Sequence, residues 1–229
     1  MKVIAVAMNK GGVGKSTLTR CIATAAAEDG FNVLALDMDT QQTTTQWGRR
    51  RTGRNRPLPL VRFTTENDLA DELAKAKVAG CDLVVIDTPP ARSSEAPAAV
   101  ECADLVIIPC TADIEAFEQV GRTARLARTT GKPALAVLNL ATPNSRSEVD
   151  AAREVFDAIG LAMAPAVIHR LKVHRDASRA GLTPQETEPS SKAAAEIAGL
   201  WEFLKGQLHG GSRAKVQKEA RARVHKEMK

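Results

Sequence analysis

The chain has 229 residues, of which 44% are hydrophobic, and a formal net charge of +5 at pH 7. This length is sufficient for one α/β domain with a full core, and the apolar fraction is ordinary for a globular protein. No apolar run reaches the roughly 20 residues of a membrane-spanning helix, and no signal-peptide layout is present. The four cysteines form no C-x-x-C pair. Their spacing disfavours a disulfide framework or a metal–cysteine site and favours a reducing cytoplasm.

The chain begins with a strand, a glycine-rich turn and a helix. Residues 3–8 are an apolar run typical of a buried strand, and residues 18–28 are an alanine-rich stretch typical of a helix. Between them lies NKGGVGKST, residues 9–17, which brings glycines and free backbone N–H groups to the start of that helix. Lys15 would contact the β- and γ-phosphates of a nucleotide, and the Ser16 hydroxyl would bind Mg²⁺. The turn therefore predicts a nucleoside triphosphate site.

Apolar runs alternate with helical patterns along the rest of the chain. Further strands are expected at residues 31–36, 58–63, 83–86, 105–108 and 134–138, and helices at 69–80, 115–128 and 148–159. This alternation predicts an α/β fold, a doubly wound and mostly parallel sheet with helices on both faces. We divide the chain into a nucleotide-binding domain, residues 1–206, and a basic tail, residues 207–229, that is helical or disordered.

Carboxylates follow two of the expected strands, at the sheet edge where such folds bind ligands. Asp37 and Asp39 follow the strand at 31–36, and Asp87 follows the strand at 83–86. We assign Asp39 to orienting the attacking water near the γ-phosphate, and Asp37 to supporting either Mg²⁺ or the loop. Asp87 would reach Mg²⁺ through water or through Ser16. The predicted metal site therefore contains Ser16, Asp37 and Asp87.

Residues 10–16, KGGVGKS, resemble the deviant Walker A motif of the ParA/MinD family of P-loop ATPases. The resemblance implies Mg²⁺-dependent ATP hydrolysis by a homodimer that sandwiches two ATP molecules, in which Lys10 crosses to the phosphates of the other subunit. It makes Lys10, Lys15 and Asp39 the catalytic residues and assigns an asparagine, Asn139, to reading adenine. The implied nucleotide-binding residues are Lys10, Gly11, Gly12, Val13, Gly14, Lys15, Ser16, Thr17 and Asn139.

Some positions depart from the family's motifs or allow a second interpretation. Asn9 stands where the usual phosphate loop begins with glycine, and Thr40 replaces the proline that the family has after its second aspartate, which puts the rigidity of that loop in doubt. The segment at 88–90, Thr-Pro-Pro, resembles the family's second switch. Asn139 fits the role of an ordinary turn residue equally well.

Positive charge is concentrated in two segments. Residues 212–229 carry seven basic and two acidic residues, so the net charge of this segment, +5, equals that of the whole chain. The second segment is an arginine-rich loop expected at 49–56. Clustered lysine and arginine bind phosphate backbones without sequence preference, although both segments could instead be solvated surface. The tail has too thin an apolar stripe to anchor on a membrane. The predicted DNA contacts are Arg49, Arg50, Arg51, Arg213, Lys215, Lys218, Arg221 and Arg223.

These features predict a small ParA-like partition ATPase that is cytoplasmic and associated with the nucleoid. Its ATP-bound homodimer would bind double-stranded DNA non-specifically, and a ParB-like centromere-binding protein would stimulate hydrolysis and release, segregating plasmid or chromosomal DNA. The alternative is a MinD-like or cargo-positioning ATPase switch that acts on a membrane or protein partner. A third hypothesis is a metabolic P-loop enzyme, such as an amide-forming synthetase.

Overall fold

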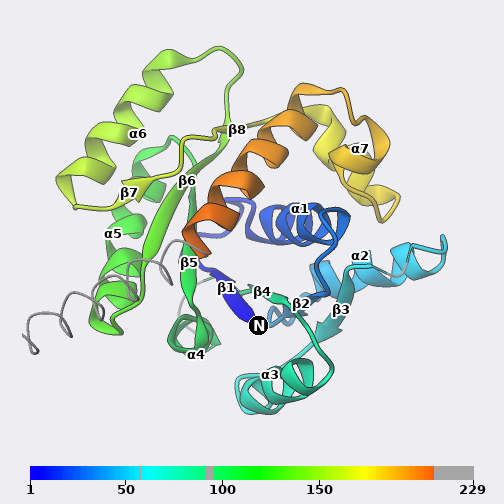
Figure 1. Cartoon of the computed structure of the whole chain (residues 1–229). Coiled ribbons are helices and arrows are strands. Elements are labelled where there is room, and N and C mark those ends of the chain that lie inside the picture. The colour runs from blue at the N-terminus through cyan, green and yellow to red at the C-terminus, as the bar shows by residue number, and fades with distance from the viewer. Residues whose placement is uncertain (57, 91–94, 209–229) are drawn as a thin grey trace, which may run out of the picture.

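A computed structural model describes residues 1–56, 58–90 and 95–208 (Figure 1). Its strands are β1 (Lys2–Val6), β2 (Val33–Asp37), β3 (Leu60–Phe63), β4 (Leu83–Asp87), β5 (Leu105–Cys110), β6 (Ala134–Ala141), β7 (Ala162–Met163) and β8 (Ile168–His169). Its helices are α1 (Lys15–Glu28), α2 (Thr43–Thr52), α3 (Leu69–Val78), α4 (Glu95–Cys102), α5 (Ile114–Thr129), α6 (Arg146–Ala158), α7 (Lys172–Arg179) and α8 (Pro184–Thr187), followed by a helix over residues 192–208.

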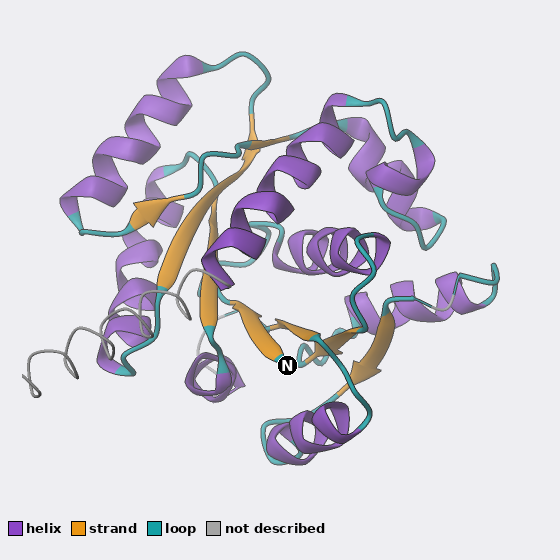
Figure 2. Cartoon of the chain, in the orientation of Figure 1, coloured by secondary structure: helices purple, strands orange, loops and turns teal. Residues whose placement is uncertain are grey.

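All strand pairs in the sheet are parallel, in the order β3-β2-β4-β1-β5-β6-β7, and β8 pairs with the end of β6. Figure 2 shows helices on both sides of the strands. Helices α3, α4, α5 and α6 contribute to the apolar core on one face of the sheet. Helix α1 and the helix at 192–208 contribute to the core on the other face. The doubly wound α/β fold is therefore confirmed.

The first half of the segment expected as an arginine-rich loop is instead helical, since Arg49, Arg50 and Arg51 lie in the last turn of α2, and residues 53–56 follow it without helical structure. The Asp37 carboxylate accepts a hydrogen bond from the backbone N–H of Thr45 at 2.7 Å and so fixes the start of this helix. Trp47 is fully buried on the inner face of α2.

The same helix carries a buried ion pair that corrects the prediction for Arg51. This side chain is 3% exposed and makes a bidentate pair with Glu186, with nitrogen–oxygen distances of 2.7 and 2.9 Å. Its guanidinium also lies over the Trp47 ring, 4.7 Å from the centroid. A buried and paired guanidinium cannot reach a DNA phosphate, so Arg51 joins α2 to α8 and is not a DNA contact.

Replacing Glu186 with alanine is expected to lower the free energy of unfolding by about 3–5 kcal/mol, because the Arg51 charge would stay buried without its carboxylate. Denaturant unfolding with a constant m-value measures this change. Glu188→Ala is the matched control, because Glu188 is exposed and two residues away. Equal midpoints for the two variants would contradict the structural role of the pair.

Candidate nucleotide-binding site

The loop between β1 and α1 has the backbone geometry of a phosphate cradle. Gly12 and Gly14 have φ angles of 77° and 88°, in the left-handed region that favours glycine. A Cβ atom on Gly14 would also lie 2.3 Å from Nδ2 of Asn139. Gly14 is the N-cap of α1 and provides no side chain to cap it, so the first N–H groups of the helix are left for an anion.

Lys15 lies inside this loop and is 7% exposed. Its Nζ donates hydrogen bonds to the backbone oxygens of Met8 at 3.1 Å and Lys10 at 3.2 Å. Burial lowers the pKa of Lys15, and the carboxylates of Asp87 and Asp39 act in the opposite direction. The loop therefore holds one cation close to the backbone that would surround the phosphates.

Asp87 is fully buried at the end of β4. Its Oδ2 accepts a hydrogen bond from Oγ1 of Thr44 at 2.7 Å, while its Oδ1 has no partner among the described residues. Burial raises the pKa of Asp87 to about 6, against the hydrogen bond from Thr44. A free carboxylate oxygen near a serine hydroxyl suits Mg²⁺, which prefers oxygen ligands, so these residues fit the predicted metal. Sequence reasoning missed Thr44, which lies in a run of three threonines without a motif of its own.

Asp37 and Asp87 are direct neighbours in register on β2 and β4. Asp37 is also fully buried, and its two oxygens accept hydrogen bonds from the backbone N–H groups of Asp39 at 3.1 Å and Thr45 at 2.7 Å. Burial raises its pKa. Both carboxylate oxygens of Asp37 thus hold the loop. This arrangement favours a loop-supporting role for Asp37 over a role as a metal ligand. Asp39 is partly exposed beside this loop and accepts a hydrogen bond from the N–H of Gln41 at 2.9 Å.

Lys10 projects to the outside of the loop and pairs with acidic residues of the same chain. Its ammonium donates a hydrogen bond to Asp113 and lies 3.7 Å from a carboxylate oxygen of Glu115. Asp113 is the N-cap of α5 and accepts from the N–H of Ala116 at 2.9 Å. Burial opposes ionisation of Asp113, but hydrogen bonds from Lys10, Thr111 and Ala116 outweigh it and lower its pKa to about 2. Sequence reasoning missed Asp113, because only the fold brings it to Lys10.

Asn139 ends the apolar part of β6, as expected, and is 1% exposed. Its Nδ2 donates to the backbone oxygen of Val13 at 2.7 Å, while its Oδ1 has no partner among the residues that the structure describes. This contact ties the amide to the phosphate loop. The reading of adenine by Asn139 stays a prediction.

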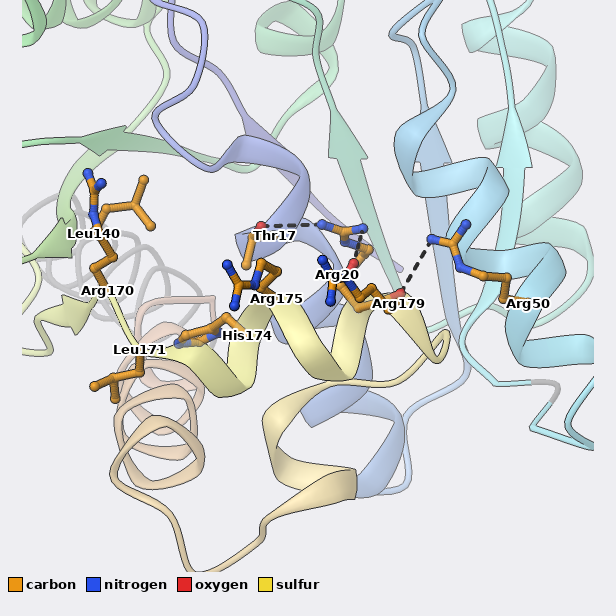
Figure 3. Close-up of a pocket in the computed structure, with 10 residues that line it drawn as sticks. Thr17, Arg20, Arg50, Leu140, Arg170, Leu171, His174, Arg175 and Arg179 are labelled. Atoms are coloured by element: carbon orange, nitrogen blue, oxygen red, sulfur yellow. Dashed lines mark hydrogen bonds between the residues drawn. The ribbon is translucent and has the colours of Figure 1, made fainter.

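A cavity of about 570 Å³ opens beside the phosphate loop (Figure 3). Ligand pockets usually have volumes of this order. Thr17 connects the cavity to the loop, and Leu140 and Leu171 give it an apolar end. Five of its lining residues are arginines. The complete lining is Thr17, Arg20, Arg50, Leu140, Arg170, Leu171, His174, Arg175, Ser178 and Arg179.

The structure thus brings the loop, Lys15, Ser16, Asp39, Asp87 and Asn139 together at the carboxyl ends of the strands, and their roles toward a nucleotide stay predictions. Arg49 and Arg50 are exposed on α2. The other predicted DNA contacts, at positions 213–223, lie outside the described residues. Within the described part of the chain, no helix combines the length and the apolar character that crossing a membrane requires.

Residues 4–183 match the family described as the CobQ/CobB/MinD/ParA nucleotide binding domain. Maintenance of carboxysome distribution protein A from Gloeobacter kilaueensis is 31% identical over 186 residues, which make up 80% of this chain and 83% of that protein. Protein ParA from Rhizobium radiobacter is 31% identical over 109 residues, or 48% of each chain.

The septum site-determining protein MinD from Pyrococcus horikoshii, solved in complex with Mg-ADP, shares the fold with a TM-score of 0.69. It is 20% identical, and the match covers 89% of this chain and 95% of that structure. The family match and the match to the carboxysome distribution protein each cover most of the chain. The protein therefore belongs to the CobQ/CobB/MinD/ParA family of nucleotide-binding domains and, within it, to the ParA/MinD-type P-loop ATPases.

Proposed function

We propose that this protein is an ATP-dependent DNA-binding switch that separates copies of a cargo, as a ParA-type partition ATPase does. The observation that carries the proposal is the different environment of the two lysines on one phosphate loop. Lys15 is buried among the loop carbonyls, whereas Lys10 is at the surface and held by carboxylates. Lys15 would bind the phosphates of its own subunit, and Lys10, once released from its carboxylates, would reach those of a second subunit.

The catalytic chemistry follows from the residues around the loop. Lys15 and the N–H groups at the start of α1 bind the phosphates, and the free oxygen of Asp87 and the Ser16 hydroxyl would hold Mg²⁺, which neutralises phosphate charge when bound. Asp39 is partly exposed at the same edge and orients the attacking water as a hydrogen-bond acceptor. Lys10 of the other subunit adds positive charge where negative charge develops on the γ-phosphate.

DNA is the partner that the surface charge favours. Arg49 and Arg50 are exposed side by side on α2, and the basic tail would add further phosphate contacts. Dimerisation doubles each patch, so weak contacts of one subunit become firm binding through effective concentration. A ParB-like protein that stimulates hydrolysis would complete the cycle, and DNA binding would associate the protein with the nucleoid. The relative named ParA supports this proposal.

A second candidate is supported by the relative named for maintenance of carboxysome distribution. In that case the ATP-dependent cycle positions a protein cargo, and the stimulating partner is bound to that cargo in place of a centromere. This candidate uses the same phosphate loop and the same dimer. The nature of the stimulating partner distinguishes it from DNA partition.

The proposal is tested by measuring binding to a random-sequence DNA duplex with ATP, ADP and no nucleotide, across a salt series. Wild-type protein is expected to bind only with ATP and to lose affinity steeply with salt, because binding releases counterions from the duplex. Asp39→Ala should bind ATP normally, hydrolyse it far more slowly and remain a DNA-bound dimer. DNA binding that ignores the nucleotide, or normal turnover by Asp39→Ala, would contradict the proposal.

A further inference from the structure

We propose that Arg50, Arg175 and Arg179 form a phosphate-binding site for the DNA backbone, here called the arginine site, and that Arg20 couples this site to the phosphate loop. The inference rests on the proposed function and deepens it. It assigns a DNA contact to the end of the cavity where Arg50 of α2 lies beside Arg175 and Arg179 of α7. It also gives a physical reason why DNA binding would depend on the nucleotide.

The arginine site carries positive charge that is poorly neutralised. Arg175 and Arg179 are one turn apart on α7, and their side chains are 66% and 74% exposed. Both pair with Asp176, at 3.6 and 3.9 Å, and this carboxylate also pairs with Lys172 at 3.5 Å. Three cations therefore share one carboxylate, and exposed pairs of this kind contribute little energy. The arginines can exchange such a partner for a phosphate oxygen.

Arg50 extends the site from α7 onto α2. Its Nη2 donates to the backbone oxygen of Ser178 at 3.4 Å. In Figure 3, Arg50 and Arg179 lie at one end of the cavity, whereas Leu140 and Leu171 lie at the other. Arg170 also lies at the end with the two leucines, and Thr17 lies between the two ends. The leucines give apolar surface for a nucleoside, whereas the end with Arg50 and Arg179 suits a second, phosphate-rich ligand.

Arg20 joins the start of α1 to α7 through one buried guanidinium. It is 6% exposed, and its Nε donates to the backbone oxygen of Ser16 at 2.9 Å. Its Nη2 donates to the Thr17 hydroxyl at 3.2 Å, and its Nη1 donates to the Ser178 hydroxyl at 3.1 Å. Because a planar guanidinium fixes the directions of its donors, a displacement of Ser16 or Thr17 by bound phosphates is transmitted to Ser178 on α7. Arg20 is thus a positioning residue for the arginine site.

The site is tested with the double variant Arg175→Gln/Arg179→Gln in the full chain with ATP. Affinity for the random-sequence duplex is expected to fall at least about tenfold, and the salt slope should shrink by about 0.9 for each lost phosphate contact. The matched control is Arg122→Gln/Arg125→Gln, which removes the same charge from two exposed positions on α5. Its binding should stay within a few-fold of wild type, and ATP affinity should be unchanged in both double variants.

Each other outcome has one meaning. Equal DNA binding by the two double variants would overturn the arginine site while the proposed function stands. Weaker ATP binding by Arg175→Gln/Arg179→Gln would assign these arginines to the nucleotide and also overturn the inference. Wild-type protein that binds no DNA with ATP would overturn both the proposed function and this inference.

The coupling role of Arg20 is tested with one variant of the acceptor, Ser178, and one variant of the donor, Arg20. Ser178→Ala removes one hydroxyl from a helix surface, and Arg20→Lys keeps the charge but cannot bridge Thr17 and Ser178. In both variants the ratio of DNA affinity with ATP to that with ADP should fall several-fold, while ATP affinity is retained. A ratio that stays at the wild-type value in Ser178→Ala, with its melting temperature unchanged, would overturn the coupling.

Discussion

Lys15→Ala is expected to bind MgATP at least about thirtyfold more weakly than the wild-type protein. The ammonium of Lys15 has three donors, and the carbonyls of Met8 and Lys10 accept two of them, so one remains for a phosphate oxygen. Removing one partner of a desolvated charge pair costs about 2–5 kcal/mol, and each 1.4 kcal/mol is about a factor of ten in affinity. Isothermal titration with a non-hydrolysable ATP analogue measures the loss.

The control for this prediction is Lys75→Ala on α3. Lys75 is exposed and pairs with Glu72, so its removal changes the net charge equally without touching the loop. Lys15→Ala should also keep the wild-type fold, since the loop retains its glycines and the core beneath it is apolar. Near-normal ATP binding by a folded Lys15→Ala protein would show that the phosphates bind elsewhere.

The sequence predicted those parts of the fold whose determinants are local. The apolar runs of β1, β2, β4, β5 and β6 and the glycine pattern of the phosphate loop are contiguous in the chain. Helix α2 was missed, because residues 43–52 are almost entirely polar and show no apolar periodicity. Its first turn is fixed by the carboxylate of Asp37, which accepts the N–H of Thr45. Residues 172–179 were likewise not predicted as a helix. Their pattern of buried and exposed positions follows from packing against the rest of the fold.

The candidate site shows the same limit. Lys15, Asp39 and Asp87 could be predicted, because motif chemistry and strand ends place them. Arg51 was misassigned, because Glu186, which neutralises it, lies 135 positions away in the sequence. Asp113 was missed for the same reason, since it lies 103 positions from Lys10. Charge in a sequence predicts a binding surface only where the fold brings no partner to it.

Lys10→Ala is expected to bind ATP as a monomer and to lose ATP-dependent dimerisation and hydrolysis. Each interface would lose two cations at the phosphates, one from each subunit. Analytical ultracentrifugation with the ATP analogue measures the dimer, and phosphate release measures turnover. An ATP-dependent dimer of wild-type affinity would contradict the role of Lys10 across the interface.

Asp113→Asn is expected to act in the opposite direction. In the monomer Asp113 and Glu115 hold the Lys10 ammonium, so Lys10 must leave these carboxylates before it can reach a second subunit. Asparagine keeps the N-cap hydrogen bond from Ala116 but loses the charge, so the concentration of ATP analogue for half-maximal dimerisation should fall a few-fold. Glu118→Gln, an equal charge change one turn further along α5, should have no effect. Opposite shifts in dimerisation for Lys10→Ala and Asp113→Asn would mean that the Lys10 ammonium binds a carboxylate pair in the monomer and a phosphate in the dimer. A loss of the dimer in both variants would mean that the pair between Lys10 and Asp113 is needed to build the interface.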